Sequence, residues 1–167
     1  RGNTPKMQFS NVLLMGLAPD GGLMLPEDYP QIDDATLTKW RSLSYPDLAF
    51  EIMQLFATDI PKADLKDLID RTYTVANFGK ADITPVRTLS DGIKIIELSN
   101  GPTLAFKDIA MQFLGNAFEY VLKKKGERLT IIGATSGDTG SAAEYALRGK
   151  DNIEVFMMSP HGKMSEF

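Results

Sequence analysis

The sequence of 167 residues contains no cysteine and only one histidine, His161. The lack of cysteine excludes disulfides, a thiolate nucleophile and a zinc site held by cysteine. A metal site or a serine hydrolase triad would have to depend on His161 alone, so we expect no metal and no such hydrolase. The absence of cysteine also fits a reducing compartment, and we expect a cytoplasmic protein.

Long apolar runs and basic tracts are also missing. The apolar stretch from Phe9 to Leu25 is interrupted by Pro19-Asp20-Gly21-Gly22 and has no signal-peptide flanks, so no membrane partner is expected. There are 22 acidic and 18 basic residues, a net charge of −4, and the longest basic run is Lys123-Lys124-Lys125. Nucleic acid is therefore not expected as a partner either. The oligomeric state is left open.

The first part of the chain has the pattern of short helices. Apolar residues at helical spacing begin at Phe9, and three further helices are expected at residues 35–40, 46–56 and 63–73. Ser44 is placed to cap the middle one. Near residue 80 the pattern becomes extended, and we expect two domains there: a mainly helical region, 1–80, and a partial α/β domain, 81–167.

The second part alternates strands and helices. A hairpin is expected at residues 86–98, because Asp91-Gly92 is a favoured tight turn between two β-branched runs. A long apolar helix should then extend from Lys107 or Asp108 to Lys125, with Gly126 as its left-handed stop. A strand, a helix and a strand follow, which predicts a parallel right-handed crossover and a doubly wound α/β sheet. These three elements are expected at 129–132, 141–147 and 153–158.

Lys107 stands at the amino-terminal end of the long helix, where its charge is opposed by the helix dipole. That effect is worth about 0.3–1 kcal/mol, whereas full burial can lower a lysine pKa by about 3–5 units, so desolvation would dominate. A neutral amine is the form that attacks carbonyls and forms Schiff bases. The alternative is that Lys107 reaches solvent or pairs with the neighbouring Asp108.

The loop Gly133–Gly140 lies between a predicted strand and a predicted helix. Its free backbone N–H groups and the helix dipole favour an anion, although its glycine spacing is not that of a dinucleotide site or a P-loop. We expect Asp138 to cap the helix from Ser141 or to brace the loop, which leaves the hydroxyls and amides for the ligand. The hydroxyl residues are Thr135, Ser136 and Thr139. The alternative is that the loop is only a helix cap.

Four segments resemble the signature segments of threonine synthases, a family of fold-type II pyridoxal-phosphate enzymes. The segments are Gly101–Asp108, Thr135–Gly140, Gly16–Leu23 and Ser159–Ser165. The resemblance covers nearly the whole chain. It implies the tryptophan-synthase β-like fold of these enzymes, and pyridoxal 5'-phosphate as cofactor.

The resemblance also implies the roles of individual residues. Lys107 would form the Schiff base and move protons, with Phe106 beside the cofactor. The reaction would convert O-phospho-L-homoserine and water to L-threonine and phosphate. The anionic substrate would be held by Thr135, Ser136, Thr139 and, through its phosphate, Lys163, with Asp138 as a loop brace.

Members of the resembled family are much longer than this chain. The groups that hold the cofactor phosphate and pyridine nitrogen would follow Phe167, so we expect an amino-terminal piece with little or no activity alone. Whether Glu166-Phe167 is native or a vector-derived tail is left open. Two alternatives stay open. One is a phospho-lyase that eliminates phosphate without adding water, and the other is a non-catalytic module that binds an anion or a partner.

Overall fold

The structure, a computed structural model, describes residues 2–164, so Glu166-Phe167, whose origin the sequence leaves open, lies outside the described residues. The chain divides between Asp70 and Arg71 into two compact units. This division lies earlier than the boundary expected near residue 80. The physical reason is that Thr72 and Tyr73 form hydrogen bonds with residues much later in the second unit, Asn116 and Ile109. Asn116 donates a 2.7 Å hydrogen bond to the hydroxyl of Thr72.

The first unit is helical, as its apolar spacing predicts. Its elements are α1 (Phe9–Met15), α2 (Asp34–Trp40), α3 (Tyr45–Met53) and most of α4 (Lys62–Thr72). The expected cap of α3 is confirmed, because the Ser44 hydroxyl accepts a hydrogen bond from the N–H of Asp47. Asp33 caps α2 in the same way through Thr36. The helix ends therefore follow local capping chemistry.

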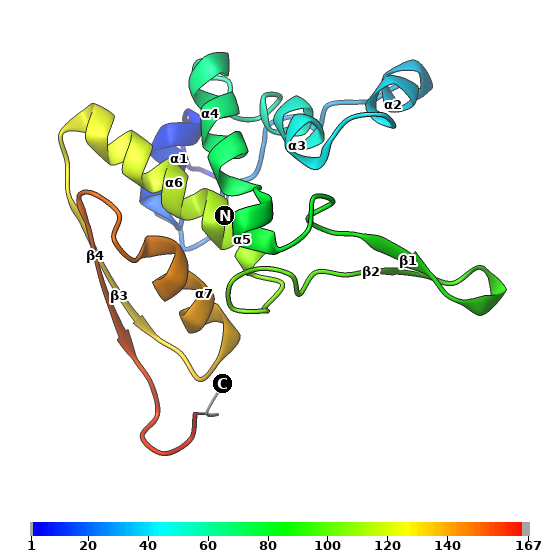
Figure 1. The fold of residues 1–167 in the computed structure, drawn as a ribbon. Helices are drawn as coiled ribbons and strands as arrows, with labels where there is room; N and C mark the ends of the chain where they lie inside the picture. Colours follow the sequence, from blue (N-terminus) through cyan, green and yellow to red (C-terminus); the bar gives the residue numbers. More distant parts are fainter. Residues whose placement is uncertain (1, 165–167) are drawn as a thin grey trace. The chain divides into compact units, whose positions relative to one another are not determined.

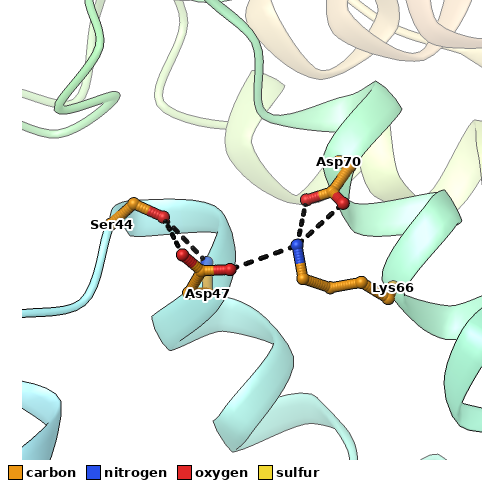
Figure 2. Close-up of polar contacts among 4 residues, drawn as sticks. All are labelled: Ser44, Asp47, Lys66 and Asp70. Atoms are coloured by element: carbon orange, nitrogen blue, oxygen red, sulfur yellow. Dashed lines mark hydrogen bonds and ion pairs between the residues drawn. The ribbon is translucent and has the colours of Figure 1, made fainter.

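A polar cluster links α3 to α4 (Figure 2). The Nζ of Lys66 lies 3.1 Å from a carboxylate oxygen of Asp47 and 2.5 Å from one of Asp70. The Ser44 hydroxyl donates to Asp47 at 2.6 Å, and this bond, followed by the bond from Lys66, lowers the pKa of Asp47. The hydrogen bond to Asp70 raises the pKa of Lys66. Because the cluster is largely exposed, it orients the two helices more than it stabilises them.

The second unit opens with a short helix and a hairpin. Helix α5 (Val75–Phe78), which the sequence patterns did not predict, is capped by Thr74. Strands β1 (Val86–Thr88) and β2 (Lys94–Ile96) pair antiparallel, and the turn between them has left-handed backbone at Asp91 and Gly92. The predicted hairpin is thus confirmed, and in Figure 1 it extends away from α6 and α7.

The rest of the unit is one strand–helix–strand motif preceded by a long helix. The elements are α6 (Asp108–Lys125), β3 (Leu129–Ala134), α7 (Asp138–Leu147) and β4 (Ile153–Met158). The expected stop of α6 is confirmed, because Gly126 has the left-handed φ of 66°. Strands β3 and β4 pair parallel, from Leu129 opposite Ile153 to Ala134 opposite Met158.

Helices α6 and α7 pack against each other on one side of β3 and β4 (Figure 1). Alternate strand residues are half-buried, while the opposite face exposes large side chains: Ile132, Phe156 and Met158. Within residues 2–164 the doubly wound arrangement is therefore represented by a single parallel strand–helix–strand unit. No helix in this part of the chain is both long enough and apolar enough to cross a membrane.

Candidate active site

Lys107 lies at the start of α6, where its backbone already has helical dihedral angles. Its carbonyl oxygen accepts hydrogen bonds from the N–H groups of Ala110 and Met111, which fixes its main chain to the first turn. The side chain is half-buried, and Nζ lies 4.3 Å from the centre of the Phe106 ring. Its ammonium makes no hydrogen bond or ion pair with any residue from 2 to 164. The alternative pairing of Lys107 with Asp108 is not formed, and the side chain is not completely buried.

Asp108 turns away from its lysine neighbour and binds the preceding loop. Its carboxylate accepts the backbone N–H and the hydroxyl of Thr103, both at 2.8 Å, and the residue is 0% exposed. Gly101 lies against it, since a Cβ there would come within 2.4 Å of the Cβ of Asp108. The sequence patterns did not single out this brace. Its only local signal is an acidic residue in the first turn of a helix.

Thr135 holds together the loop between β3 and α7. Its hydroxyl oxygen accepts the N–H groups of Gly137 at 3.3 Å and Gly140 at 3.1 Å. A Cβ on Gly140 would lie 1.8 Å from the Cγ2 of Thr135, so only glycine fits there. The N–H of Thr135 also donates to the carbonyl of Met158 at 2.9 Å, which joins the loop to the end of β4.

The role expected for Asp138 is wrong in this structure. Helix α7 begins at Asp138 and not at Ser141, Gly137 occupies the cap position, and there is no side-chain cap. The carboxylate of Asp138 is exposed and makes no hydrogen bond or ion pair within the described residues. The brace is Thr135, whose hydroxyl was expected to face a ligand. The physical reason is that a β-branched hydroxyl residue can bond amides along the loop, so no carboxylate is needed.

Ser136 is exposed in the loop, and Thr139 is exposed in the first turn of α7. The N–H groups of Gly140 and Ser141 in α7 bond to Thr135 and Gly137, so the amides left to face a ligand are those of Asp138 and Thr139 at the start of the helix. Lys163 is exposed in the turn after β4, where its N–H donates to the carbonyl of Pro160. No hydrogen bond or ion pair holds the Lys163 side chain among residues 2–164.

Topology brings these groups toward one edge of the second unit. Because β3 and β4 are parallel and in register, the loops that follow them leave from the same end of the sheet. Helix α6 runs opposite to β3 (Figure 1), so its amino-terminal end, with Lys107, faces that same end. The amino termini of α6 and α7 thus both direct partial positive charge to this edge. Within the described residues, no cluster of three or more side chains is suited to hold a metal ion.

Comparison with known proteins gives these features a context. The family model for the threonine synthase N terminus matches residues 1–73. Threonine synthase from Methylobacillus glycogenes is 56% identical to this chain, and the alignment covers 100% of this chain and 37% of that protein. The enzyme from Corynebacterium glutamicum is 54% identical over 96% of this chain and 34% of its own length. The chain thus spans about a third of the length of these curated relatives.

Solved structures agree with the sequence match. A PLP-bound threonine synthase from Brucella melitensis has a TM-score of 0.93 and 42% identity, covering 98% of this chain and 35% of that one. Yeast threonine synthase has a TM-score of 0.90 and 47% identity, covering 97% of this chain and 35% of that one. The predicted fold is confirmed as part of a fold-type II pyridoxal-phosphate enzyme. The chain therefore belongs to the threonine synthase family, in which it matches the amino-terminal part of the members.

Proposed function

We propose that this chain supplies the Schiff-base lysine of a threonine synthase, which converts O-phospho-L-homoserine and water to L-threonine and phosphate with pyridoxal 5'-phosphate. The observation that carries the proposal is the position of Lys107. It lies in the family-like segment Gly101–Asp108, at the start of a helix, and no carboxylate among residues 2–164 pairs with its ammonium. The cytoplasmic location and the absence of a nucleic-acid partner remain predictions.

The residues present fit the aldehyde end of the cofactor. Pyridoxal phosphate, when bound, supplies an electron sink that stabilises carbanions. Lys107 offers an amine that makes no salt bridge in the described chain, and the adjoining Phe106, whose ring centre is 4.3 Å from Nζ, is 57% exposed. Lys107 would form the Schiff base and, when released, carry protons between substrate carbons. Phe106 would provide an apolar surface beside the cofactor.

The anionic groups of the substrate would be held at the loop 135–139. The Ser136 and Thr139 hydroxyls are exposed there, the first two amides of α7 would add further donors, and the helix dipole favours negative charge. Thr135 would act by keeping this loop in shape. Lys163 would add a positive charge for the phosphate. Asp138 would not contact the anionic groups, because its exposed carboxylate would repel them.

The decisive experiment replaces Lys107 by Ala in the full-length protein encoded by the reading frame that contains this sequence. We expect threonine formation to fall by at least about 10³-fold, because Schiff-base formation and proton transfer are both lost. The visible absorbance of the bound cofactor should change at the same time. Lys124→Ala is a matched control, since Lys124 also lies over an aromatic ring, that of Tyr120 at 4.5 Å, at the other end of α6. Unchanged turnover and an unchanged spectrum in Lys107→Ala would refute the enzyme proposal and favour a non-catalytic module.

A second candidate is a phospho-lyase that releases phosphate without adding water at Cβ. Relatives of this chain do not all carry the plain name threonine synthase: one from Xenopus laevis, named threonine synthase-like 2, is 44% identical over 99% of this chain. Quantifying threonine and keto acid from O-phosphohomoserine in one assay distinguishes the two. Threonine as the main product supports the first candidate, and keto acid the second.

A further inference from the structure

Asp108 is buried and ionisable, yet the proposed function gives it no part. Its two hydrogen bonds run backward along the chain to Thr103, whereas an ordinary cap lies ahead of the helix and binds its first amides. The two residues thereby close a short ring of main chain, residues 103–108. Lys107 and Phe106 both lie inside that ring, so the bonds constrain the segment that carries the amine.

The rest of the ring shows how closely it is held. Leu104 has a left-handed φ of 59°, which costs a non-glycine residue free energy and persists only where neighbouring bonds impose it. Ala105 is 7% exposed, and its carbonyl accepts the N–H of Asp108 at 3.0 Å. Gly101 leaves room for the carboxylate, since an added Cβ would lie 2.5 Å from its Oδ2. The loop therefore has one well-bonded arrangement centred on Asp108.

We propose that Asp108 and Thr103 are positioning residues for Lys107: their paired hydrogen bonds hold the 103–108 ring so that the amine stays against Phe106 at the edge where substrate binds. This proposal rests on the proposed function for its kinetic consequence. Neither residue touches the reacting atoms. A displacement of about 1 Å at a reacting group can reduce the rate by up to about 10²-fold, so bonds remote from the chemistry can matter for turnover.

The kinetic test uses Thr103→Val and Thr103→Ser in the full-length protein. Valine keeps the shape but loses the hydroxyl bond, and we expect kcat to fall about tenfold with KM changed less than about twofold. The pH at the midpoint of the cofactor's visible absorbance change should also shift. Serine keeps the hydroxyl and should restore both values. Asp108→Asn provides a second variant, because its amide nitrogen replaces one of the two acceptor oxygens and cannot accept, and it should change kcat in the same direction.

The matched control is Thr72→Val, which removes another buried threonine bond to α6, that from Asn116. Asn116 lies about 13 Å along the helix from Lys107. Thr72→Val should lower the stability to urea by about as much as Thr103→Val does, but it should leave kcat and the absorbance midpoint unchanged. Equal kinetic effects of Thr72→Val and Thr103→Val would overturn the proposal, since both would then act through stability alone.

A further measurement does not depend on the proposed function. Limited labelling with an amine-reactive reagent, without added cofactor, compares Lys107 with Lys124 by peptide mass spectrometry. Thr103→Val should raise the ratio of labelling at Lys107 to labelling at Lys124 about threefold, because a loosened ring exposes Lys107 more often. An unchanged ratio would contradict the positioning role. If Lys107→Ala leaves turnover intact while this ratio rises, the proposed function fails and the positioning of Lys107 stands.

Discussion

Gly140 and Thr135 show how a single atom decides a position in the loop after β3. The methyl group and the hydroxyl of Thr135 occupy the space that a Cβ at position 140 would need. Gly137 lies in the same loop but has nothing within 4 Å of an added Cβ, and its φ of 172° is extended backbone. The two glycines look alike in sequence, yet only one is required by contact.

Gly140→Ala should therefore destabilise the protein by about 1–3 kcal/mol, the usual cost of overpacking a closely packed position. The Thr135 brace would be pushed out of place, and the N–H of Gly140 would lose its hydroxyl partner. Gly137→Ala is the matched control and should stay within about 0.5 kcal/mol of the parent protein. Urea unfolding of the full chain measures both. Similar losses for the two variants would contradict the contact argument.

Between elements, the close packing of α6 on α7 depends on Gly115. An added Cβ would lie 2.3 Å from the carbonyl oxygen of Ala146, which is backbone and cannot rotate away. The small residues of α7 that face inward, Ala142, Ala143 and Ala146, are all buried. The strand–helix–strand unit thus carries α7 close against α6, and so brings the loop 135–137 toward the helix that begins after Lys107.

Gly115→Ala decides between two opposing effects on α6. Helix propensity favours alanine by about 1 kcal/mol, whereas overpacking costs about 1–3 kcal/mol. Because the obstructing atom is backbone, we expect overpacking to win and the variant to be less stable. Ala110→Gly, at an exposed position of the same helix, measures the propensity effect alone. If Gly115→Ala is more stable to urea than the parent, the two helices are not in the contact described.

For the whole molecule, stability should depend on pH through several exposed or half-buried carboxylates. The pKa of Asp20 is lowered by the N–H groups of Gly2 and Gly22, and that of Asp33 by Thr36. The pKa of Asp47 is lowered by hydrogen bonds from Ser44 and Lys66, and the pKa of Glu97 by a hydrogen bond from Lys80. In each case the folded-state pKa lies below the unfolded value. Such groups stabilise the fold above the unfolded pKa and lose that contribution as the pH falls through the folded pKa.

The free energy of unfolding should thus decrease as the pH is lowered below about 4.5, near the unfolded pKa of carboxylates. Urea titrations of the full chain from pH 7 to pH 3 measure this. Asp47→Asn removes one bonded carboxylate (Figure 2) and should flatten the decrease. Asp28→Asn, an exposed carboxylate without a hydrogen bond among the described residues, is the control. A stability that stays level or rises between pH 5 and pH 3 would be incompatible with these bonds.

Much of this molecule was predictable from local patterns, because their causes are local. Apolar spacing, the Ser44 cap and the Gly126 stop depend on residues within one or two helical turns, and the structure confirms them. The Asp91-Gly92 hairpin is similarly determined by its turn. Lys107 and the loop 135–140 were selected by residue type and spacing, and the family that they suggested is the one the comparisons show.

Only the tertiary structure decided which side chains contact each other, because these contacts depend on the direction of each side chain and on residues far apart in the chain. Asp108 binds Thr103 and not Lys107, and Thr135 rather than Asp138 braces its loop, because the direction of a side chain depends on backbone angles that residue type does not specify. The unit boundary follows the bond between Thr72 and Asn116. Composition and periodicity determine which elements form, whereas the fit of particular atoms determines how Lys107 is held.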